Sequence, residues 1–400
     1  MTNTSQNLQA AARVRLSAAR ERGFGLVELM ISMLIGLVII AALVTLFVNT
    51  SGGNRELARA NSMIENGRFA IKVLEDDLGH AGYWGGFIPM FDDQTSNDVP
   101  TDVPAAIPDP CQDPATWTLA DRENLIGIPV QAYDDAASAE LDTCETDGVI
   151  ADYEDDPATD ILIVRHVDTC AVGEGGYCAV DLAGMVYMQV SRCDSDPPPP
   201  ARYVLDTAGF TATQMNCATA AERRRYVSNI YYIRDYAVTA GDGIPTLVRS
   251  EFDFVGGTLA QQPAVPLVEG VEAFRIEFGV DDVARSGDTV DYPADFLDPI
   301  DWVDDEDKNT ATNRGDGLPD GDFVRCTTAV PCTVSDLMNA TSAKIYVLAR
   351  SREASPNYTD TKTYTLGAAG AVGPFNDNFK RHVFTTTVRL PNIAGRRILP

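Results

Sequence analysis

The sequence predicts an α+β protein, in which one long N-terminal helix packs on a mainly antiparallel β-sheet domain with long loops. Three observations lead to this fold class. An almost unbroken apolar run covers residues 24–48, and a helical apolar stripe follows it at residues 57–81. From residue 160 onward, short apolar or alternating segments are separated by turn-rich acidic stretches, which is typical of strands joined by loops.

The charge of the chain changes sharply where the apolar run begins. The first 23 residues hold four arginines and one acid, Glu21, whereas the whole chain has a formal net charge of -27. Such an acidic chain argues against nucleic-acid binding, which needs a basic face to meet phosphates. We therefore divide the chain into a basic segment (1–23), a hydrophobic helix (24–53), an amphipathic helix (54–82) and an acidic α+β domain (83–400).

The apolar run is long enough to cross a membrane as one helix. Residues 24–48 would span about 37 Å, against a hydrocarbon core of about 30 Å. A secretory signal peptide fits poorly, because its apolar region is only about 7–15 residues long. Since arginines precede the run and acids follow it, the positive-inside rule places Met1 in the cytoplasm and the acidic domain on the other side.

Glu28 is the one charged residue inside the apolar run. A carboxylate there costs roughly 2.5–3.5 kcal/mol on insertion scales, so it usually has a partner and a role. The nearby cation that can serve is an amino terminus, which would exist if the chain were cut just before Phe24. An ordinary single-pass anchor is the alternative interpretation.

The residues from Arg22 to Leu29, RGFGLVEL, resemble the processing site of type IV prepilins and type II secretion pseudopilins. The resemblance implies a prepilin leader at residues 1–23, which a prepilin peptidase removes after Gly23. It also implies that Phe24 becomes an N-methylated amino terminus and that Glu28 pairs with such a terminus during assembly. A leader of this length is longer than is common in the family, which leaves open a translation start after Met1.

A second helical pattern follows the apolar run. Gly52 and Gly53 each cost about 1 kcal/mol in a helix interior, so we expect a kink or a short melted stretch there. We expect the apolar stripe beyond them to pack on the protein's own sheet, while the first part of this helix contacts other subunits. Glycines between residues 79 and 86 end the helix. The stripe consists of Leu57, Ala60, Ile64, Gly67, Ile71, Leu74, Leu78 and Ala81.

Three segments resemble the PilW-like minor pilins of type IV pili more closely. They are residues 65–85 (ENGRFA through AGYWG), the strand pattern at 268–280 and the closing strand pattern at 382–390. The resemblance implies a minor pilin of the bacterial inner membrane, with a periplasmic domain, that is inserted in the pilus fibre or primes it. Its implied partners are other minor and major pilins, the inner-membrane assembly platform and membrane lipid. A type II secretion minor pseudopilin is one alternative, and a pilus-tip adhesin or calcium-binding module for cell adhesion is another.

Strand patterns dominate the acidic domain. Ile161–Val167 is an apolar run suited to a buried strand, and residues 274–280 alternate with Arg275 and Glu277 as in a half-buried strand. Residues 343–349 and 384–390 have similar patterns. The chain has three histidines and no H-E-x-x-H, G-x-S-x-G or phosphate-loop motif, so we do not expect an enzyme.

One acidic, glycine-rich loop at residues 313–322, NRGDGLPDGD, is a candidate metal site. Calcium favours clustered oxygen ligands on a flexible backbone, and Asp316, Asp320 and Asp322 are the candidate ligands, together with acids at 301–307. The loop does not match the twelve-residue helix–loop–helix pattern, and a solvated acidic loop is the alternative. No other cofactor is expected. The loop also contains an integrin-type triplet, RGD, which at three residues carries little weight.

Eight cysteines follow the apolar segment, and none forms a C-x-x-C pair, so zinc-ribbon and thioredoxin-type sites are poorly supported. An even number of cysteines after a membrane segment favours disulfides made in an oxidising compartment. We expect near neighbours to pair, such as Cys170 with Cys178 and Cys326 with Cys332. The remaining candidates are Cys111, Cys144, Cys193 and Cys217.

Overall fold

The chain forms two compact units, Met1–Leu57 and Ala58–Pro400, each of which is described by itself. The first 22 residues and Phe24 lie outside the described residues, so the expected leader and new amino terminus have no structural description here. The computed structural model describes residues 23, 25–93, 100–154, 157–176, 178–193, 195–196, 202–284, 287, 289–290, 292 and 314–397.

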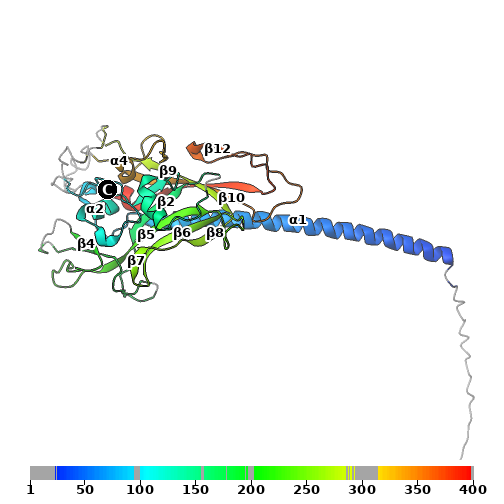
Figure 1. Ribbon diagram of the computed structural model, residues 1–400, viewed down its shortest axis with the longest axis horizontal. Coiled ribbons are helices and arrows are strands. Elements are labelled where there is room, and N and C mark those ends of the chain that lie inside the picture. The colour runs from blue at the N-terminus through cyan, green and yellow to red at the C-terminus, as the bar shows by residue number, and fades with distance from the viewer. Residues whose placement is uncertain are drawn as a thin grey trace, which may run out of the picture. The chain divides into compact units, whose positions relative to one another are not determined.

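The first unit consists of the N-terminal part of helix α1 (Leu26–His80), drawn in blue in Figure 1. The helix is continuous through Gly52 and Gly53, so the expectation of a melted stretch there is wrong. The two glycines together cost about 2 kcal/mol relative to alanine. Helix propagation is cooperative, and the long helical segments on both sides keep the backbone hydrogen bonds in place.

In the second unit, the C-terminal part of α1 buries one face. Its buried residues are Met63, Gly67, Ala70, Leu74 and Leu78. The expected stripe is therefore only partly correct: Gly67, Leu74 and Leu78 are buried, but Ile64 and Ile71 are half-buried and Leu57 is exposed. Gly67 and Ala70 lie in the centre of the contact because small residues let a helix approach its neighbours closely.

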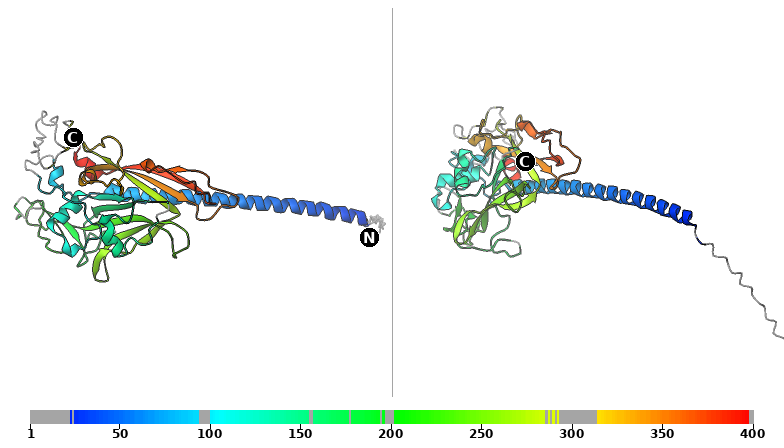
Figure 2. Two further views of the ribbon diagram at one scale, coloured as in Figure 1. Left: turned by 45° about the horizontal axis from the view of Figure 1, so that its top comes forward. Right: turned by 45° about the vertical axis from the view of Figure 1, so that its right-hand side comes forward.

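The second unit contains a larger antiparallel sheet, whose green strands are visible in Figures 1 and 2. Among the described residues its strand order is β1-β2-β5-β3-β4, and β6 pairs with β5, β7 and β8. The strands are β1 (Val130–Tyr133), β2 (Ile161–Val167), β3 (Tyr187–Val190), β4 (Tyr203–Asp206), β5 (Arg223–Arg234), β6 (Thr246–Val255), β7 (Thr258–Gln261) and β8 (Val265–Glu269).

A smaller antiparallel sheet has the order β13-β10-β9, and a short hairpin, β11–β12, lies in the connection from β10 to β13. One core cluster contains residues of α1 and of both sheets, so this part of the helix packs in the core that the two sheets share. The elements are β9 (Val271–Val280), β10 (Ala340–Arg350), β11 (Tyr364–Thr365), β12 (Ala371–Val372) and β13 (Arg381–Arg389). The short helices are η1 (Met90–Asp92), η2 (Pro114–Thr116), α2 (Leu119–Gly127), η3 (Ala139–Leu141), α3 (Asp142–Thr146), α4 (Val334–Met338), η5 (Gly367–Ala369) and α5 (Pro391–Arg397). The α+β class expected from the sequence is confirmed.

Strand β9 is buried on both faces, which corrects the half-buried pattern expected from its sequence. The guanidinium of Arg275 lies 3.1 Å from the carboxylate of Asp160. Glu277 accepts a hydrogen bond from the Tyr346 hydroxyl at 3.2 Å and another from a backbone amide of η5. Charged side chains can be buried when such partners satisfy them. The alternation of apolar and charged residues in β9 therefore distinguishes its two faces but does not show that the charged face is exposed to solvent.

Gly270 connects the two sheets between β8 and β9, with a φ of 76°. Its N–H donates to the Pro245 carbonyl, and its own carbonyl accepts from the Arg350 N–H, each at 2.8 Å. A Cβ on this residue would lie 2.8 Å from the Arg350 carbonyl oxygen, which is a backbone atom that cannot rotate away. Both the left-handed conformation and the close approach therefore require glycine.

Changing Gly270 to alanine is expected to lower the free energy of unfolding by about 2–3 kcal/mol, through left-handed strain and overpacking. Gly256 is a matched control, because it also has positive φ but its Cβ would meet nothing within 4 Å. Gly256→Ala should lose only the strain part, about 1 kcal/mol. Urea unfolding of both variants measures this difference, and equal losses would rule out the steric contribution.

Arg381, at the start of β13, is buried among three carboxylates. Its Nη1 donates to Asp360 at 3.0 Å and to Asp377 at 2.7 Å, and its Nη2 donates to Glu272 at 2.8 Å. The ring of Phe375 covers the guanidinium, with 3.6 Å between the ring centroid and Cζ. Burial opposes the charge, but the hydrogen bonds with Asp377 and Glu272 raise the pKa of Arg381. A charged arginine therefore joins the β10–β13 connection to β9.

All eight cysteines are paired in disulfides, at sequence separations of 33, 8, 24 and 6 residues. Each bond therefore closes a local loop of the second unit. The two near-neighbour pairs expected from the sequence are among the four. The bonds are Cys111–Cys144, Cys170–Cys178, Cys193–Cys217 and Cys326–Cys332.

Candidate assembly site

Glu28 lies in the first turn of α1, three residues after Gly25. The Gly25 N–H donates a hydrogen bond to the Glu28 carboxylate, with 3.1 Å between N and Oε2. The first N–H groups of a helix have no acceptor within the helix, and the helix dipole favours negative charge at that end. The carboxylate therefore caps the N-terminal end of α1, which begins just after the predicted cut. Gly23, the residue before that cut, is exposed.

The surface of the first unit is apolar all around the helix. Every large apolar side chain from Leu26 to Val48 is more than half exposed within this chain. By length and composition, α1 is able to cross a membrane. The hydroxyls of Ser32 and Thr45 donate to carbonyls four residues earlier, at 2.6 and 2.9 Å. These polar groups are thus satisfied inside the helix, which suits a surface that meets lipid or other apolar helices.

Residues 65–85 attach α1 to the rest of the second unit. The Asn66 side chain donates to the Glu269 carbonyl at 2.9 Å. Gly67 faces the ring of Phe384 on β13 so closely that a Cβ there would overlap it. Beyond the helix, the indole N–H of the buried Trp84 donates to a carbonyl of α2 at 3.1 Å. The motif therefore works as a set of contacts that fix the helix against both sheets.

Asp77 is the polar centre of this attachment. Its carboxylate lies 3.0 Å from His166 Nε2 on β2 and accepts from the Asn229 amide and the Tyr231 hydroxyl on β5, each at 2.9 Å. The other ring nitrogen, His166 Nδ1, lies 3.0 Å from the Val167 carbonyl oxygen. Both ring nitrogens thus face acceptors, which is the arrangement that an imidazolium, a donor on both nitrogens, satisfies.

The two pKa values shift in the directions that favour an ion pair. Burial alone would lower the pKa of His166, but its hydrogen bond with Asp77 and the charge of that carboxylate raise it overall. Burial alone would raise the pKa of Asp77, but the hydrogen bond and charge of His166 lower it overall. The helix is therefore joined to β2 by a charged pair.

No sequence motif singles out Asp77. The residue lies three positions after Leu74 and one before Leu78, so it falls on the buried face of an amphipathic helix. A carboxylate at a buried helical position needs a partner, because an unpaired buried charge is costly. That position was the available signal, while the identity of the partner depends on the tertiary fold.

The acidic loop does not bring its three candidate ligands together. Asp316 accepts from the Leu318 N–H, and Asp320 accepts from the Val283 N–H, each at 2.9 Å. Within the described chain, no group of three or more His, Cys, Asp or Glu side chains is placed to hold a metal ion. Asp322 therefore belongs to no such group. The acids at 301–307 lie outside the described residues. Calcium binding by this loop stays a prediction.

The RGD triplet in this loop has a structural role. Arg314 is fully buried, and its guanidinium lies over the Tyr292 ring at 4.3 Å from the centroid. The backbone N–H groups of Asp316 and Gly317 donate to the buried Asp281 carboxylate at 3.1 and 2.9 Å. Because the arginine faces inward, the triplet does not present the side chains that a receptor would recognise.

Two protein-family models match this chain. Residues 230–392 match the family described as type IV pilus-assembly protein W, and residues 18–44 match the prokaryotic N-terminal methylation motif. Over these two segments the chain is similar to PilW-type pilus-assembly proteins and to N-methylated pilins. No curated protein sequence matches it. A type IV-like pilin from Thermus thermophilus is a similar solved structure, with 14% identity and a TM-score of 0.22, over 59% of this chain and 80% of that one.

The residues matched by the two family models include the features described above. The methylation-motif match contains Gly23, Glu28 and most of the apolar surface, and this part of α1 is long and apolar enough to cross a membrane. The assembly-family match begins within β5 and contains β9, β10 and β13, including Arg381 and Phe384. The family resemblance inferred from the sequence is thus confirmed.

Proposed function

We propose that this PilW-like pilin is a minor pilin, processed by a prepilin peptidase after Gly23 and then inserted in a type IV pilus or priming its assembly. The observation that carries the proposal is the position of Glu28, in the first turn of an exposed apolar helix and inside the methylation-motif match. The match to a type IV pilus-assembly family favours a pilus over a secretion pseudopilus.

Cleavage would create an ammonium on Phe24, directly before the N–H that Glu28 already accepts. A lone ammonium or carboxylate is costly in an apolar helix bundle, and the two neutralise each other when they pair. Pairing between neighbouring subunits would favour one stagger of their helices, since other staggers leave both charges unpaired. The apolar surface from Leu26 to Val48 would contact lipid first and other pilin helices later.

The body would lie in the periplasm before assembly. Four disulfides support an oxidising compartment for residues 111–332. The arginines before the apolar run support a cytoplasmic N-terminus. Other minor and major pilins and the inner-membrane assembly platform are the partners that this role requires.

Processing and assembly can be separated with two variants in cells that have an active prepilin peptidase. Intact mass and N-terminal sequencing should show that the wild-type protein begins at N-methylated Phe24, and that Gly23→Ala remains an uncut precursor. Glu28→Leu should be cut normally but be absent from sheared pili. Gly36→Ala is the control for the glycine change, because its Cβ would meet nothing within 4 Å; it should be cut and assembled.

Normal processing of Gly23→Ala would refute the cut site, and normal fibre incorporation of Glu28→Leu would refute the charge-pairing mechanism. Deleting the gene separates the two machines. Loss of surface pili with normal export of secreted proteins supports the pilus, whereas blocked export with normal pili would assign the chain to type II secretion.

A further inference from the structure

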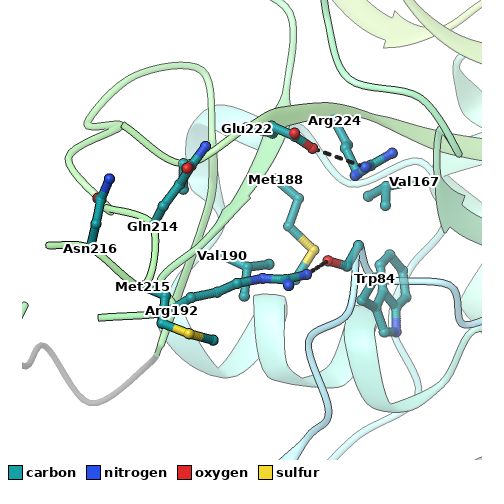
Figure 3. A pocket seen from close by; sticks show the side chains of 12 residues that line it. Trp84, Val167, Met188, Val190, Arg192, Gln214, Met215, Asn216, Glu222 and Arg224 are labelled. Atoms are coloured by element: carbon teal, nitrogen blue, oxygen red, sulfur yellow. Dashed lines mark hydrogen bonds and ion pairs between the residues drawn. The ribbon is translucent and has the colours of Figure 1, made fainter. Parts of the chain in front are cut away.

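A pocket of about 460 Å³ opens beside the segment that follows α1 (Figure 3). Its floor is apolar and buried, and its rim is polar and more exposed. Trp84, Val167 and Met188 form the floor, while Arg192 and Gln214 lie on the rim. A pocket of this size and composition holds a small ligand or the end of one chain.

Arg192 gives this pocket a positive charge. Its Nη2 donates a long hydrogen bond of 3.4 Å to the Gly85 carbonyl, and no carboxylate of the described chain lies within ion-pair distance of it. Arg224, across the pocket, is instead paired with Glu222 at 3.1 Å. In a chain with a net charge of -27, a cation left without a carboxylate beside an apolar floor favours an anionic ligand.

Gln214 adds an amide to the same rim. Its side chain has no hydrogen-bond partner within the described chain. Its backbone is held in place, because its N–H donates to the Thr219 carbonyl and its carbonyl accepts from the Cys217 N–H, each at 2.8 Å. The Cys193–Cys217 disulfide closes this loop. A fixed carboxamide can donate to and accept from a peptide group.

We propose that this pocket binds the C-terminal end of a partner polypeptide whose last side chain is apolar. Arg192 binds the terminal carboxylate, Gln214 pairs with the last peptide group, and the side chain fills the floor beside Met188. Because Arg224 is already paired with Glu222, Arg192 offers the pocket one uncompensated positive charge, which matches a carboxylate better than a doubly charged phosphate. The inference rests on the pocket alone and is independent of processing and assembly.

Calorimetric titration of the full chain in mild detergent tests each contact with a different probe. N-acetyl-alanyl-phenylalanine with a free carboxylate should bind. Its C-terminal amide should bind about tenfold more weakly or worse, because the charge-assisted hydrogen bonds are lost. N-acetyl-alanyl-serine should also bind more weakly, because it leaves the floor empty.

Two variants test the site. Arg192→Gln changes an exposed side chain and should weaken binding of the phenylalanine peptide about tenfold, while leaving its amide unaffected. Arg389→Gln makes the same change at an exposed arginine of β13 outside the pocket and should bind like wild type. Near-ultraviolet circular dichroism verifies that both variants are folded.

Three results would overturn the proposal. The absence of measurable heat with the phenylalanine peptide up to about 10 mM would exclude binding of a polypeptide end. Equal affinity of wild type and Arg192→Gln would exclude the assigned carboxylate contact. Tighter binding of galacturonate than of the peptide would assign the pocket to a carboxylated sugar and exclude a polypeptide end.

Discussion

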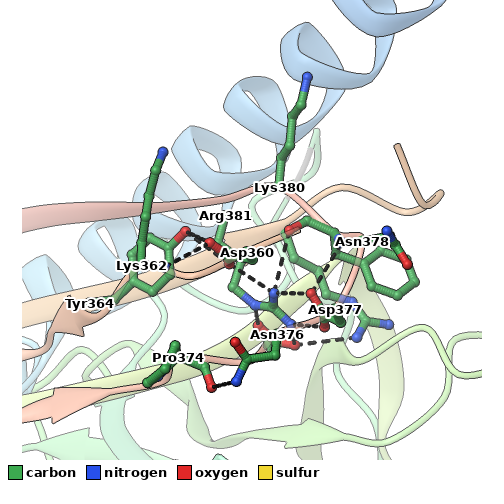
Figure 4. Close-up of polar contacts among 12 residues, drawn as sticks. Asp360, Lys362, Tyr364, Pro374, Asn376, Asp377, Asn378, Lys380 and Arg381 are labelled. Atoms are coloured by element: carbon green, nitrogen blue, oxygen red, sulfur yellow. Dashed lines mark hydrogen bonds and ion pairs between the residues drawn. The ribbon is translucent and has the colours of Figure 1, made fainter. Parts of the chain in front are cut away.

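Replacing Arg381 with methionine is expected to lower the free energy of unfolding of the second unit by about 3–5 kcal/mol. The guanidinium satisfies Glu272, Asp360 and Asp377 at once, as the dashed lines in Figure 4 show for the labelled carboxylates. Glu272 and Asp360 are buried, with 4% and 0% of their surface exposed. Methionine fills similar space but leaves these carboxylates near one another without a cation.

The loss in Arg381→Met should become smaller as the pH falls. Without the arginine, burial and mutual repulsion raise the pKa values of the carboxylates, so the folded variant binds more protons than its unfolded chain and loses stability as pH rises. In the wild type, hydrogen bonds with Arg381 lower the pKa of Asp377 below its ordinary value of 3.8. That contribution to wild-type stability is present above pH 3.8 and is lost as pH falls. Its loss also reduces the difference in free energy of unfolding between wild type and Arg381→Met.

Urea unfolding of the full chain in detergent, near pH 7.5 and pH 4.5, measures this effect. Tryptophan fluorescence is suitable because all three tryptophans follow residue 83. Arg352→Met is the matched control, since Arg352 forms an ion pair of 2.8 Å with Glu269 but is 52% exposed. Such a surface pair contributes about 0–1 kcal/mol. Equal losses in the two variants, or a loss in Arg381→Met that grows at low pH, would contradict the buried-cluster interpretation.

Replacing Asp77 with asparagine is expected to cost about 3–5 kcal/mol near pH 5.5. At this pH the unfolded chain protonates His166, whereas the folded variant must either bury an imidazolium without a carboxylate or keep the imidazole neutral, and both cost stability. The substitution also weakens the hydrogen bonds that Asn229 and Tyr231 donate to the same group. Near pH 8.5 the imidazole of the variant is neutral and can still hydrogen-bond to the carboxamide, so the cost should fall to about 1–3 kcal/mol.

The pH window follows from the two shifts. The pKa of His166 is raised above 6.5, so its contribution is complete below pH 6.5 and is lost as pH rises through the folded-state pKa. The pKa of Asp77 is lowered below 3.8, so its contribution is present above pH 3.8 and is lost as pH falls. The pair therefore stabilises the fold most between these limits.

Asp76→Asn provides the control for this prediction. Asp76 is the next residue on the same helix, is 61% exposed and forms an ion pair of 2.6 Å with Lys72. Its loss should be within about 1 kcal/mol at both pH values. The ion-pair interpretation fails if Asp77→Asn loses no more stability near pH 5.5 than near pH 8.5.

Features with local sequence periodicity could be predicted from the sequence. The apolar run, the amphipathic half of α1 and strand β2 followed from such patterns, and β2 has the bounds expected for it. The position of Glu28 near a helix end was also predictable, because the apolar run begins four residues earlier. Each of these features is determined by residues that are close together in the sequence, so the local pattern is enough to predict it.

Pairings between distant residues could not be predicted. Arg381 meets Glu272 across 109 positions, and His166 meets Asp77 across 89. In a chain with 58 acidic residues, each basic side chain has many candidate partners, and the fold selects among them. The burial of Arg275 in β9 was missed for the same reason, since its partner Asp160 lies on another segment.

The local closure of every disulfide has a mechanical consequence. None of the four bonds includes a residue of α1, so a pulling load applied along the helix cannot be carried to the sheets by a covalent cross-link. The load passes instead through non-covalent contacts along the helix, which include the Asn66 and Asp77 hydrogen bonds, the Gly67–Phe384 contact and the apolar core around Leu74. Reducing agents should therefore soften the loops of the second unit while leaving the rupture force between helix and sheets nearly unchanged.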